Sequence, residues 1–297
     1  MRPATWLVLI ATLLLWSGNW IVARAVRDDI SPGLATAGRL VIVLLVLAPF
    51  VWRELAAKLP QLKRRDWLIV AGMGLAGGGP HLALQWLGVH YTTAASGILY
   101  LSTTPIFILL LTTALGERIR ARQWTGVAIS FAGVFLIVTH GAPQSFSFNA
   151  GDLLALLSMM MWASYTVLLR VRRDPLGVIA LLCLVCAFGG LFMTPWLAVE
   201  VLLGAKIALT REGAAAVLYS AIGSLLLAYA GWSYVVSRLG PARAGVTLHL
   251  MPAFGVVLSA IFLGEYPRWY HFAGIALVLT GVALSSTARA SSAASSR

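Results

Sequence analysis

Charged residues are scarce in this chain of 297 residues, of which 11% are Asp, Glu, Lys or Arg and 60% are hydrophobic. The mean hydropathy is +0.87. Because roughly a quarter of the residues in a typical soluble domain are charged, this composition excludes a soluble globular protein and indicates a membrane protein. The stretches between the apolar runs are too short for a folded soluble domain. We therefore expect a single membrane-embedded unit.

Motifs for cofactors and metals are also missing. No P-loop sequence, zinc-ligand spacing or dinucleotide fingerprint occurs, so we expect neither a cofactor nor a metal. The two cysteines, Cys183 and Cys186, lie one turn apart in an apolar run. A metal site or redox pair is one interpretation, but small packing residues in a membrane helix are the favoured one.

Signals of catalysis are weak. Ser96 and Gly97 with His249 loosely resemble an intramembrane serine protease of the rhomboid type, but that pattern requires glycine where this chain has Ala94. A lipid-handling enzyme or flippase-like protein is a second alternative. Such an enzyme should show catalytic carboxylates or a His–Asp pair near an interface, and the sequence offers no convincing pair. We therefore expect a protein that is not an enzyme.

What the chain does have is a series of apolar runs of the length that spans a bilayer, which is about 20 residues per helix. They predict an all-α polytopic membrane protein with ten transmembrane helices. The expected helices lie at about 4–24, 32–52, 67–89, 93–114, 122–140, 150–171, 176–199, 212–237, 242–263 and 269–287.

The basic residues indicate orientation rather than a nucleic-acid partner, although the net charge is +12. They are not clustered on one polar face but concentrate in alternate loops, as positive-inside topology requires. Most of the 22 Lys and Arg residues then fall on the cytoplasmic side if the N-terminus is cytoplasmic. We expect a multi-pass protein of a bacterial inner membrane with both termini in the cytoplasm and the lipid bilayer as its surroundings.

An internal repeat relates the two halves of the chain at a separation of 146 to 148 residues. The tetrapeptide WSGN at 16–19 reappears as WASY at 162–165. In the later part of each half, Pro105, Gly116, Glu117, Gly126 and Gly133 recur as Pro252, Gly264, Glu265, Gly274 and Gly281. Repeats of this length in an apolar chain are typical of transporters built from two related halves.

The repeat also predicts the domain organisation. The first repeat covers residues 1–140 and the second covers 150–287, with five helices in each. Because five is odd, the second repeat enters the membrane from the opposite side and is inverted. The polar, small residues at 288–297 are expected to form a disordered tail.

Few ionisable groups fall inside the predicted helices, and each is a functional candidate because burial in hydrocarbon is costly. His81 is the strongest. It follows Gly77, Gly78, Gly79 and Pro80, which predict a break near the centre of the third helix and a hinge there. Broken backbone at membrane depth is tolerated where it packs in protein or lines a watery cavity. A kink needed only for packing is the alternative.

Other candidates follow from position and from the repeat. Gln85 shares a helical face with His81. Tyr229 is the counterpart of His81 in the second repeat. Trp16 and Trp162 lie well inside their helices at matched positions, where a buried indole needs a hydrogen-bond partner. Packing alone is the competing interpretation for each aromatic residue. The remaining polar or aromatic candidates on these and the fourth and ninth helices are Asn19, Tyr100, Tyr165 and His249.

Proline and glycine supply further features of the predicted helices. Pro105 and Pro252 are expected to bend the fourth and ninth helices and to act as hinges. The glycines of the fifth and tenth helices are seven residues apart and favour close helix packing, within the protein or against a second copy. The oligomeric state stays open.

These residues also carry a family resemblance over nearly the whole chain. The segments PIFILLLTTALGERIRARQWTGVAISFAGVFLIV and PAFGVVLSAIFLGEYPRWYHFAGIALVLTGVAL resemble the recurring end of the EamA domain, and LLLWSGNWIVARAV resembles its opening. The chain is therefore similar to the drug/metabolite transporter superfamily in its ten-helix form, and in particular to YddG-type exporters of neutral amino acids. The resemblance implies efflux through a central cavity surrounded by helices 1, 3, 4, 6, 8 and 9.

We therefore expect an inner-membrane transporter that exports neutral or aromatic amino acids and related small metabolites by alternating access. The shortage of membrane carboxylates disfavours cationic drugs, because a dehydrated cation needs a counter-charge. All three lysines lie in loops, which disfavours multiply charged anions. Carriers of a drug, purine or sugar remain the alternative, and neither energy coupling nor direction follows from the sequence.

Overall fold

The computed structural model describes residues 3–26, 28–91, 100–142, 150–205, 210–254, 257 and 268–286. These residues are almost entirely helical and contain no β-strand, which confirms the predicted all-α class. In chain order the helices are α1 (Pro3–Ala25), α2 (Pro32–Lys58), the 3-10 turn η1 (Leu59–Gln61), α3 (Arg64–Gly77), α4 (Gly79–Tyr91), α6 (Thr104–Ala114), α7 (Ala121–Val138), α8 (Ala150–Val171), α9 (Val178–Leu202), α10 (Arg211–Tyr219), the π-helix η3 (Ser220–Leu227), α11 (Ala228–Leu239), α12 (Pro241–Thr247) and α14 (Trp269–Ser286).

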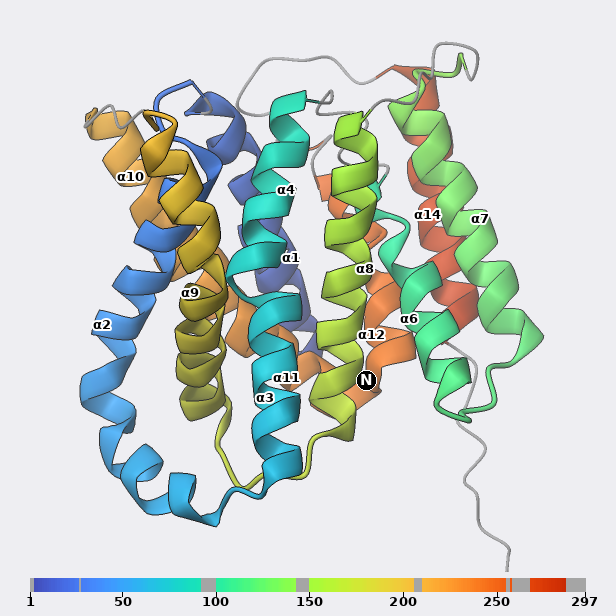
Figure 1. Cartoon of the computed structure of the whole chain (residues 1–297). Helices are drawn as coiled ribbons and strands as arrows, with labels where there is room; N and C mark the ends of the chain where they lie inside the picture. Colours follow the sequence, from blue (N-terminus) through green and yellow to red (C-terminus); the bar gives the residue numbers. More distant parts are fainter. Residues whose placement is uncertain are drawn as a thin grey trace, which may run out of the picture.

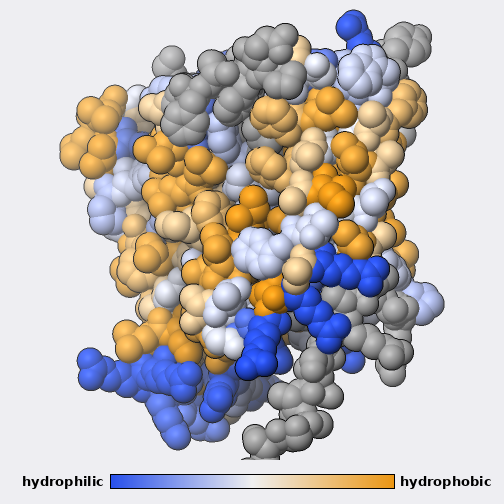
Figure 2. Space-filling view, turned by 90° about the vertical axis from the view of Figure 1, so that its right-hand side faces the viewer, coloured by the Kyte–Doolittle hydropathy of each residue, from blue (hydrophilic) through white to orange (hydrophobic). Residues whose placement is uncertain are grey.

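The helices run side by side with their long axes roughly parallel (Figure 1). Within the described ranges, seven helices are long and apolar enough to cross a membrane, and two shorter apolar helices accompany them. Figure 2 shows a broad hydrophobic band above hydrophilic residues that gather at the lower end. The start of α1 and the connections from α2 to α3 and from α8 to α9 lie at this same lower end (Figure 1). The protein is a multi-pass membrane protein.

Some sequence-based expectations lie outside the described residues. The run predicted at 93–114 begins there, and the run predicted at 242–263 continues there. Ala94, Ser96 and Gly97 of the protease-like pattern also lie outside the described residues. So do the repeat members Gly264 and Glu265 and the expected tail at 288–297.

The fifth and tenth spans pack against each other through their glycines. A Cβ placed on Gly133 would lie 2.6 Å from the carbonyl oxygen of Gly274, and one on Gly126 would lie 2.6 Å from that of Gly281. Between these contacts the hydroxyl of Ser130 donates to the carbonyl of Val278 at 3.3 Å. The glycines spaced seven residues apart therefore allow α7 to pack closely on α14 within one chain. The sequence alone left open whether they pack within the protein or against a second copy.

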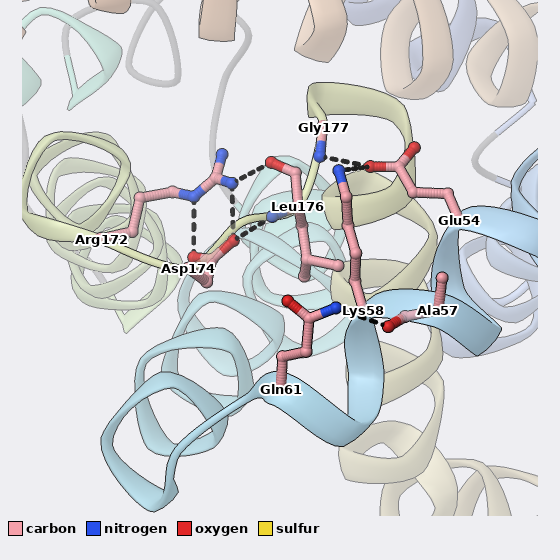
Figure 3. A network of polar contacts seen from close by, with 8 residues as sticks. All are labelled: Glu54, Ala57, Lys58, Gln61, Arg172, Asp174, Leu176 and Gly177. Atoms are coloured by element: carbon pink, nitrogen blue, oxygen red, sulfur yellow. Dashed lines mark hydrogen bonds and ion pairs between the residues drawn. The ribbon is translucent and has the colours of Figure 1, made fainter.

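The helices α2 and α9 form a second pair in which each one caps the other. Glu200, near the end of α9, accepts from the amide of Gly33 at 3.0 Å and from the hydroxyl of Ser31 at 2.6 Å at the start of α2. At the other end, Glu54 of α2 accepts from the amide of Gly177, at the start of α9, at 2.7 Å (Figure 3). Each carboxylate satisfies amides that a helix N-terminus leaves unpaired.

These two caps obey the internal repeat, because Glu54 and Glu200, like Ser31 and Gly177, are 146 residues apart. Ser31 and Gly177 are the N-cap residues of α2 and α9. The lower cap is reinforced by an ion pair of 2.7 Å between Lys58 and Glu54 (Figure 3). Since matched carboxylates cap the start of the partner helix at opposite ends of the pair, α2 and α9 run antiparallel, as expected for inverted repeats.

Replacing Glu200 with alanine is expected to lower the unfolding free energy by about 2 kcal/mol, because at least one cap and one hydroxyl bond are lost. The apparent Tm in detergent should fall by a few degrees. Glu212→Ala, at an exposed position in the first turn of α10, is the matched control and should change the Tm little. Equal Tm values for the two variants would show that the Glu200 cap does not stabilise the fold.

The third span is interrupted where the sequence predicts. α3 ends at Gly77, Gly78 leaves the helix with φ −96° and ψ −138°, and α4 begins at Gly79. The break packs directly against α9, because a Cβ on Gly78 would lie 2.9 Å from the Cα of Gly189. Pro80 falls in the first turn of α4, where its missing amide proton costs no helical hydrogen bond. The hinge role of Gly77, Gly78, Gly79 and Pro80 stays a prediction.

The fourth and ninth spans are interrupted as well, ahead of their prolines rather than at them. A turn at Ser102 and Thr103 precedes α6, so Pro105 stands in the first turn of a new helix. A turn at 248–249 follows α12, three residues before Pro252. A ring nitrogen of His249 lies 2.8 Å from the carbonyl oxygen of Ser102. Ser102 and His249 are repeat mates, so the two breaks meet near the axis that relates the halves.

Candidate functional site

One pocket lies among the interrupted helices and the helices that carry the matched tryptophans Trp16 and Trp162. Residues of the first, third, fourth, sixth, eighth and ninth spans form it, which is the set that the family resemblance implies. The wall consists of Trp16, Asn19, Trp20, His81, Leu82, Gln85, Leu101, Met159, Trp162, Ser224, Tyr229, Leu248 and Met251.

Six sequence-predicted residues are brought together in this wall: Trp16, Asn19, His81, Gln85, Trp162 and Tyr229. The wall contains no Asp, Glu, Lys or Arg among the residues that the structure describes. Nor do these residues include any group of three or more His, Cys, Asp or Glu side chains placed to hold a metal ion. The cavity is therefore aromatic and polar, but its immediate wall carries no fixed charge.

His81 is held by the sixth span in a defined orientation. Its Nδ1 lies 2.8 Å from the carbonyl oxygen of Ser158 and 2.9 Å from the hydroxyl of that residue. The Ser158 hydroxyl in turn donates to the His81 carbonyl at 3.0 Å. Because a carbonyl oxygen can only accept, Nδ1 carries the proton. A neutral ring then offers Nε2 to the cavity as a hydrogen-bond acceptor.

Aromatic rings surround this histidine. The ring of Trp162 stacks on His81 with centroids 5.4 Å apart and an interplanar angle of 22°. Its repeat mate Trp16 meets Trp162 edge to face at 5.1 Å and 88°. Tyr229 approaches Trp162 at 5.0 Å and donates its hydroxyl to the Gly77 carbonyl at 2.7 Å, at the end of α3. The broken helix thus supplies both the histidine and an anchor for the aromatic wall.

The π-helix in the eighth span supplies a matching anchor. The indole nitrogen of Trp16 donates to the carbonyl of Ser224 at 3.0 Å. In the same segment, Ser220 donates its hydroxyl to Oδ1 of Asn19 at 2.5 Å. A π-helix widens the backbone turn and often occurs at functional sites. Here it fixes two cavity residues of α1 whose polar groups would otherwise face hydrocarbon.

Three predicted site residues lie outside the wall. Tyr165 stacks behind Trp162 with centroids 5.0 Å apart at 24°. Tyr100 is buried, and it interacts with Asp152 at the start of α8. His249 is fully buried and uses Nε2 on Ser102. These side chains support the wall or the helix breaks, and the structure does not bring them to the cavity.

Two residues that sequence reasoning missed are central to the buried region. Trp232 is fully buried, lies 5.4 Å from Trp16 and donates to the Thr166 hydroxyl at 3.1 Å. Trp232 could have been selected from the sequence because it lies three residues after Tyr229, on the same face of α11. Arg39 was not selected as a candidate from the sequence, and only 1% of its surface is exposed. Its position two turns inside an apolar run was the available signal.

Comparison with known proteins gives one family for the whole chain. The sequence matches the EamA-like transporter family twice, over residues 4–139 and 149–287. A protein of Archaeoglobus fulgidus named "Uncharacterized transporter" is 30% identical over 96% of this chain and 98% of its own length.

A protein of Streptantibioticus cattleyicolor named "Probable terminal-alkyne amino-acid exporter" is 26% identical over 96% of this chain and 93% of its own length. A solved structure described as "Crystal structure of protein" superposes with a TM-score of 0.74 across 96% of both chains at 22% identity. That last likeness concerns the fold alone.

Proposed function

This chain belongs to the EamA-like transporter family of membrane transporters, and from that premise we propose that it exports neutral and aromatic amino acids through the cavity described above. The observation that carries the proposal is the stack of His81 on Trp162 at the broken third span. Trp16 and Tyr229 continue this aromatic surface. An aromatic or apolar side chain of a substrate would bury its surface against these rings.

The polar end of the substrate would meet hydrogen-bonding groups on the same wall. Nε2 of His81 accepts from the ammonium group, and Gln85 and Asn19 can donate or accept. The name of the Streptantibioticus cattleyicolor relative, an amino-acid exporter, supports this substrate class. A cationic drug is disfavoured because the described wall contains no carboxylate.

Alternating access in this proposal moves bodies that each contain helices of both repeats. α2 packs with α9 at one side of the bundle, and α7 packs with α14 at the other (Figure 1). Because these contacts join the repeats, simple rocking of residues 1–140 against 150–287 would break them. The breaks at Gly78, at 102–103 and at 248–249 are where the cavity helices can bend while both outer pairs stay intact.

Orientation follows from the charges at the lower end of the bundle. The connection from α2 to α3 lies there, and Lys58, Lys63, Arg64 and Arg65 lie in it or at the adjoining helix ends. Because cytoplasmic loops carry an excess of Lys and Arg, we assign this end and the start of α1 to the cytoplasm of a bacterial cell. Export then runs from the lower end to the upper end of Figure 1.

Counterflow in proteoliposomes tests the proposal. Vesicles loaded with unlabelled phenylalanine should take up radiolabelled phenylalanine with saturable kinetics, and unlabelled methionine or threonine should compete. Vesicles without protein give the background. Absence of counterflow by folded, correctly inserted protein would leave the family assignment intact and overturn the amino-acid substrate.

A further inference from the structure

Arg39 is a buried positive charge with no acidic partner among the described residues. It lies two turns into α2, and 1% of its surface is exposed. The ion pairs within the described ranges join Lys58 to Glu54 and Arg172 to Asp174, both near the lower end of the bundle. A charge removed from water inside a membrane protein normally pairs with another group or serves a ligand.

Its contacts leave donors unused. The guanidinium stacks 4.5 Å from the centroid of the Trp86 ring, and Nη2 donates to the Thr36 hydroxyl at 2.9 Å. Nε of Arg39 and Nε1 of Trp86 are both buried and have no hydrogen-bond partner among the residues that the structure describes. Leaving such buried donors unpaired is energetically unfavourable. Two stacked side chains therefore combine one positive charge with two unsatisfied N–H groups.

Neither residue of this pair lines the cavity, and the pair is buried behind the wall. Trp86 follows the wall residue Gln85 on α4, and α2 packs against both α4 and η3, which contribute to the wall. The charge of Arg39 acts electrostatically on His81 and Tyr229, two further wall residues. An anionic group in the cavity is therefore attracted toward Arg39, and the wall residues nearest to it contain no competing carboxylate.

We propose that Arg39 and Trp86 form an anion subsite that binds the carboxylate group of the transported substrate. Nε and one terminal nitrogen of an arginine match the two oxygens of a carboxylate, and the indole N–H supplies a third donor. His81 offers an acceptor on the cavity wall, so an amino acid would be held with its ammonium at His81 and its carboxylate at Arg39. This inference rests on the proposed amino-acid function. It specifies how the protein would distinguish substrates that have a carboxylate from those that lack one.

Binding of three related ligands to purified protein tests the subsite: phenylalanine, 3-phenylpropionate without the amine, and phenethylamine without the carboxylate. Arg39→Gln should weaken binding of the two carboxylates by more than about tenfold. The same change should leave phenethylamine binding equal or stronger, because a repelling charge is removed. A merely structural role of Arg39 would weaken all three ligands together and would overturn the proposal.

Matched variants keep the test sharp. Thr36→Val removes the hydroxyl that Arg39 contacts but keeps the charge, and it should preserve the preference for carboxylates. Trp86→Phe keeps a ring under the guanidinium but removes the N–H, so carboxylate binding alone should weaken. If Arg39→Gln does not fold, the Trp86→Phe result decides, and an unchanged carboxylate affinity in that variant overturns the subsite.

Two further outcomes separate the sources of failure. Wild-type protein that binds none of the three ligands would overturn the amino-acid function and the subsite with it, whereas tight carboxylate binding by Arg39→Gln would overturn the subsite only. Chloride binding tests whether the pair instead binds a free inorganic anion. Arg39-dependent chloride binding that does not compete with 3-phenylpropionate would show that the pair serves an inorganic ion, contrary to the proposal.

Discussion

Gly133→Ala is expected to destabilise the protein by more than about 3 kcal/mol, although alanine is the better helix former. The new methyl group would lie 2.6 Å from the Gly274 carbonyl oxygen and 2.9 Å from the Val278 amide nitrogen. Both atoms belong to the backbone of α14, so no side-chain rotation relieves the overlap and the two helices must separate. We expect a large fall in the apparent Tm and in the yield of monodisperse protein, measured by thermal denaturation and size-exclusion chromatography in detergent.

Gly190→Ala is the matched control in α9. It makes the same change inside a helix, but nothing lies within 4 Å of the added Cβ. Its Tm should be unchanged or higher, because alanine in a helix is favoured over glycine by up to about 1 kcal/mol. Opposite signs at the two positions are therefore predicted. A harmless Gly133→Ala would mean that α7 and α14 do not approach as closely as described.

His81→Asn is the second large effect and separates the two ring nitrogens. The asparagine amide can replace Nδ1 in its contact with Ser158, but it has no group at the position of Nε2. If Nε2 accepts from the substrate ammonium, phenylalanine counterflow should fall by about ten- to a hundredfold while the folded protein persists. His81→Gln places an amide farther out, near the Nε2 position, and should recover part of the activity.

His140→Asn controls for the chemical change itself. His140 is exposed beyond the end of α7 and has a positive φ of 52°, a conformation that asparagine tolerates well. Counterflow by this variant should match the wild type. Normal kinetics of His81→Asn in the same assay would remove Nε2 from the substrate site and leave His81 as a packing residue of the helix break.

The parts of the account that the sequence predicts correctly depend on local or repeated signals. The break in the third span follows from three glycines and a proline, because those residues change backbone preferences wherever they occur. Glycines spaced seven residues apart predict close helix packing in both repeats, and the structure shows that it joins α7 to α14. Trp16 and Trp162 were selected by their matched positions, and the structure places both in the cavity wall.

The parts that the sequence misses depend on which face of a helix is buried. Tyr100 and His249 were chosen by their depth in a continuous helix, but Tyr100 interacts with Asp152 and His249 lies in the turn at 248–249 and contacts Ser102. Arg39 was not selected from the sequence, although it lies two turns inside an apolar run. Its burial arises from Trp86 of another span, a contact that no local pattern encodes.

The central claim is that the cavity lined by Trp16, His81 and Trp162 is the substrate site and opens to each side in turn. The most direct measurement is the rate of thiol labelling of Met251→Cys in protein whose two buried cysteines, Cys183 and Cys186, are replaced by alanine. A membrane-impermeant reagent should label this wall position from either side of the vesicle, and saturating phenylalanine should slow both rates severalfold. Labelling that phenylalanine leaves unchanged on both sides, in protein that still catalyses counterflow, would place the substrate elsewhere and contradict the account.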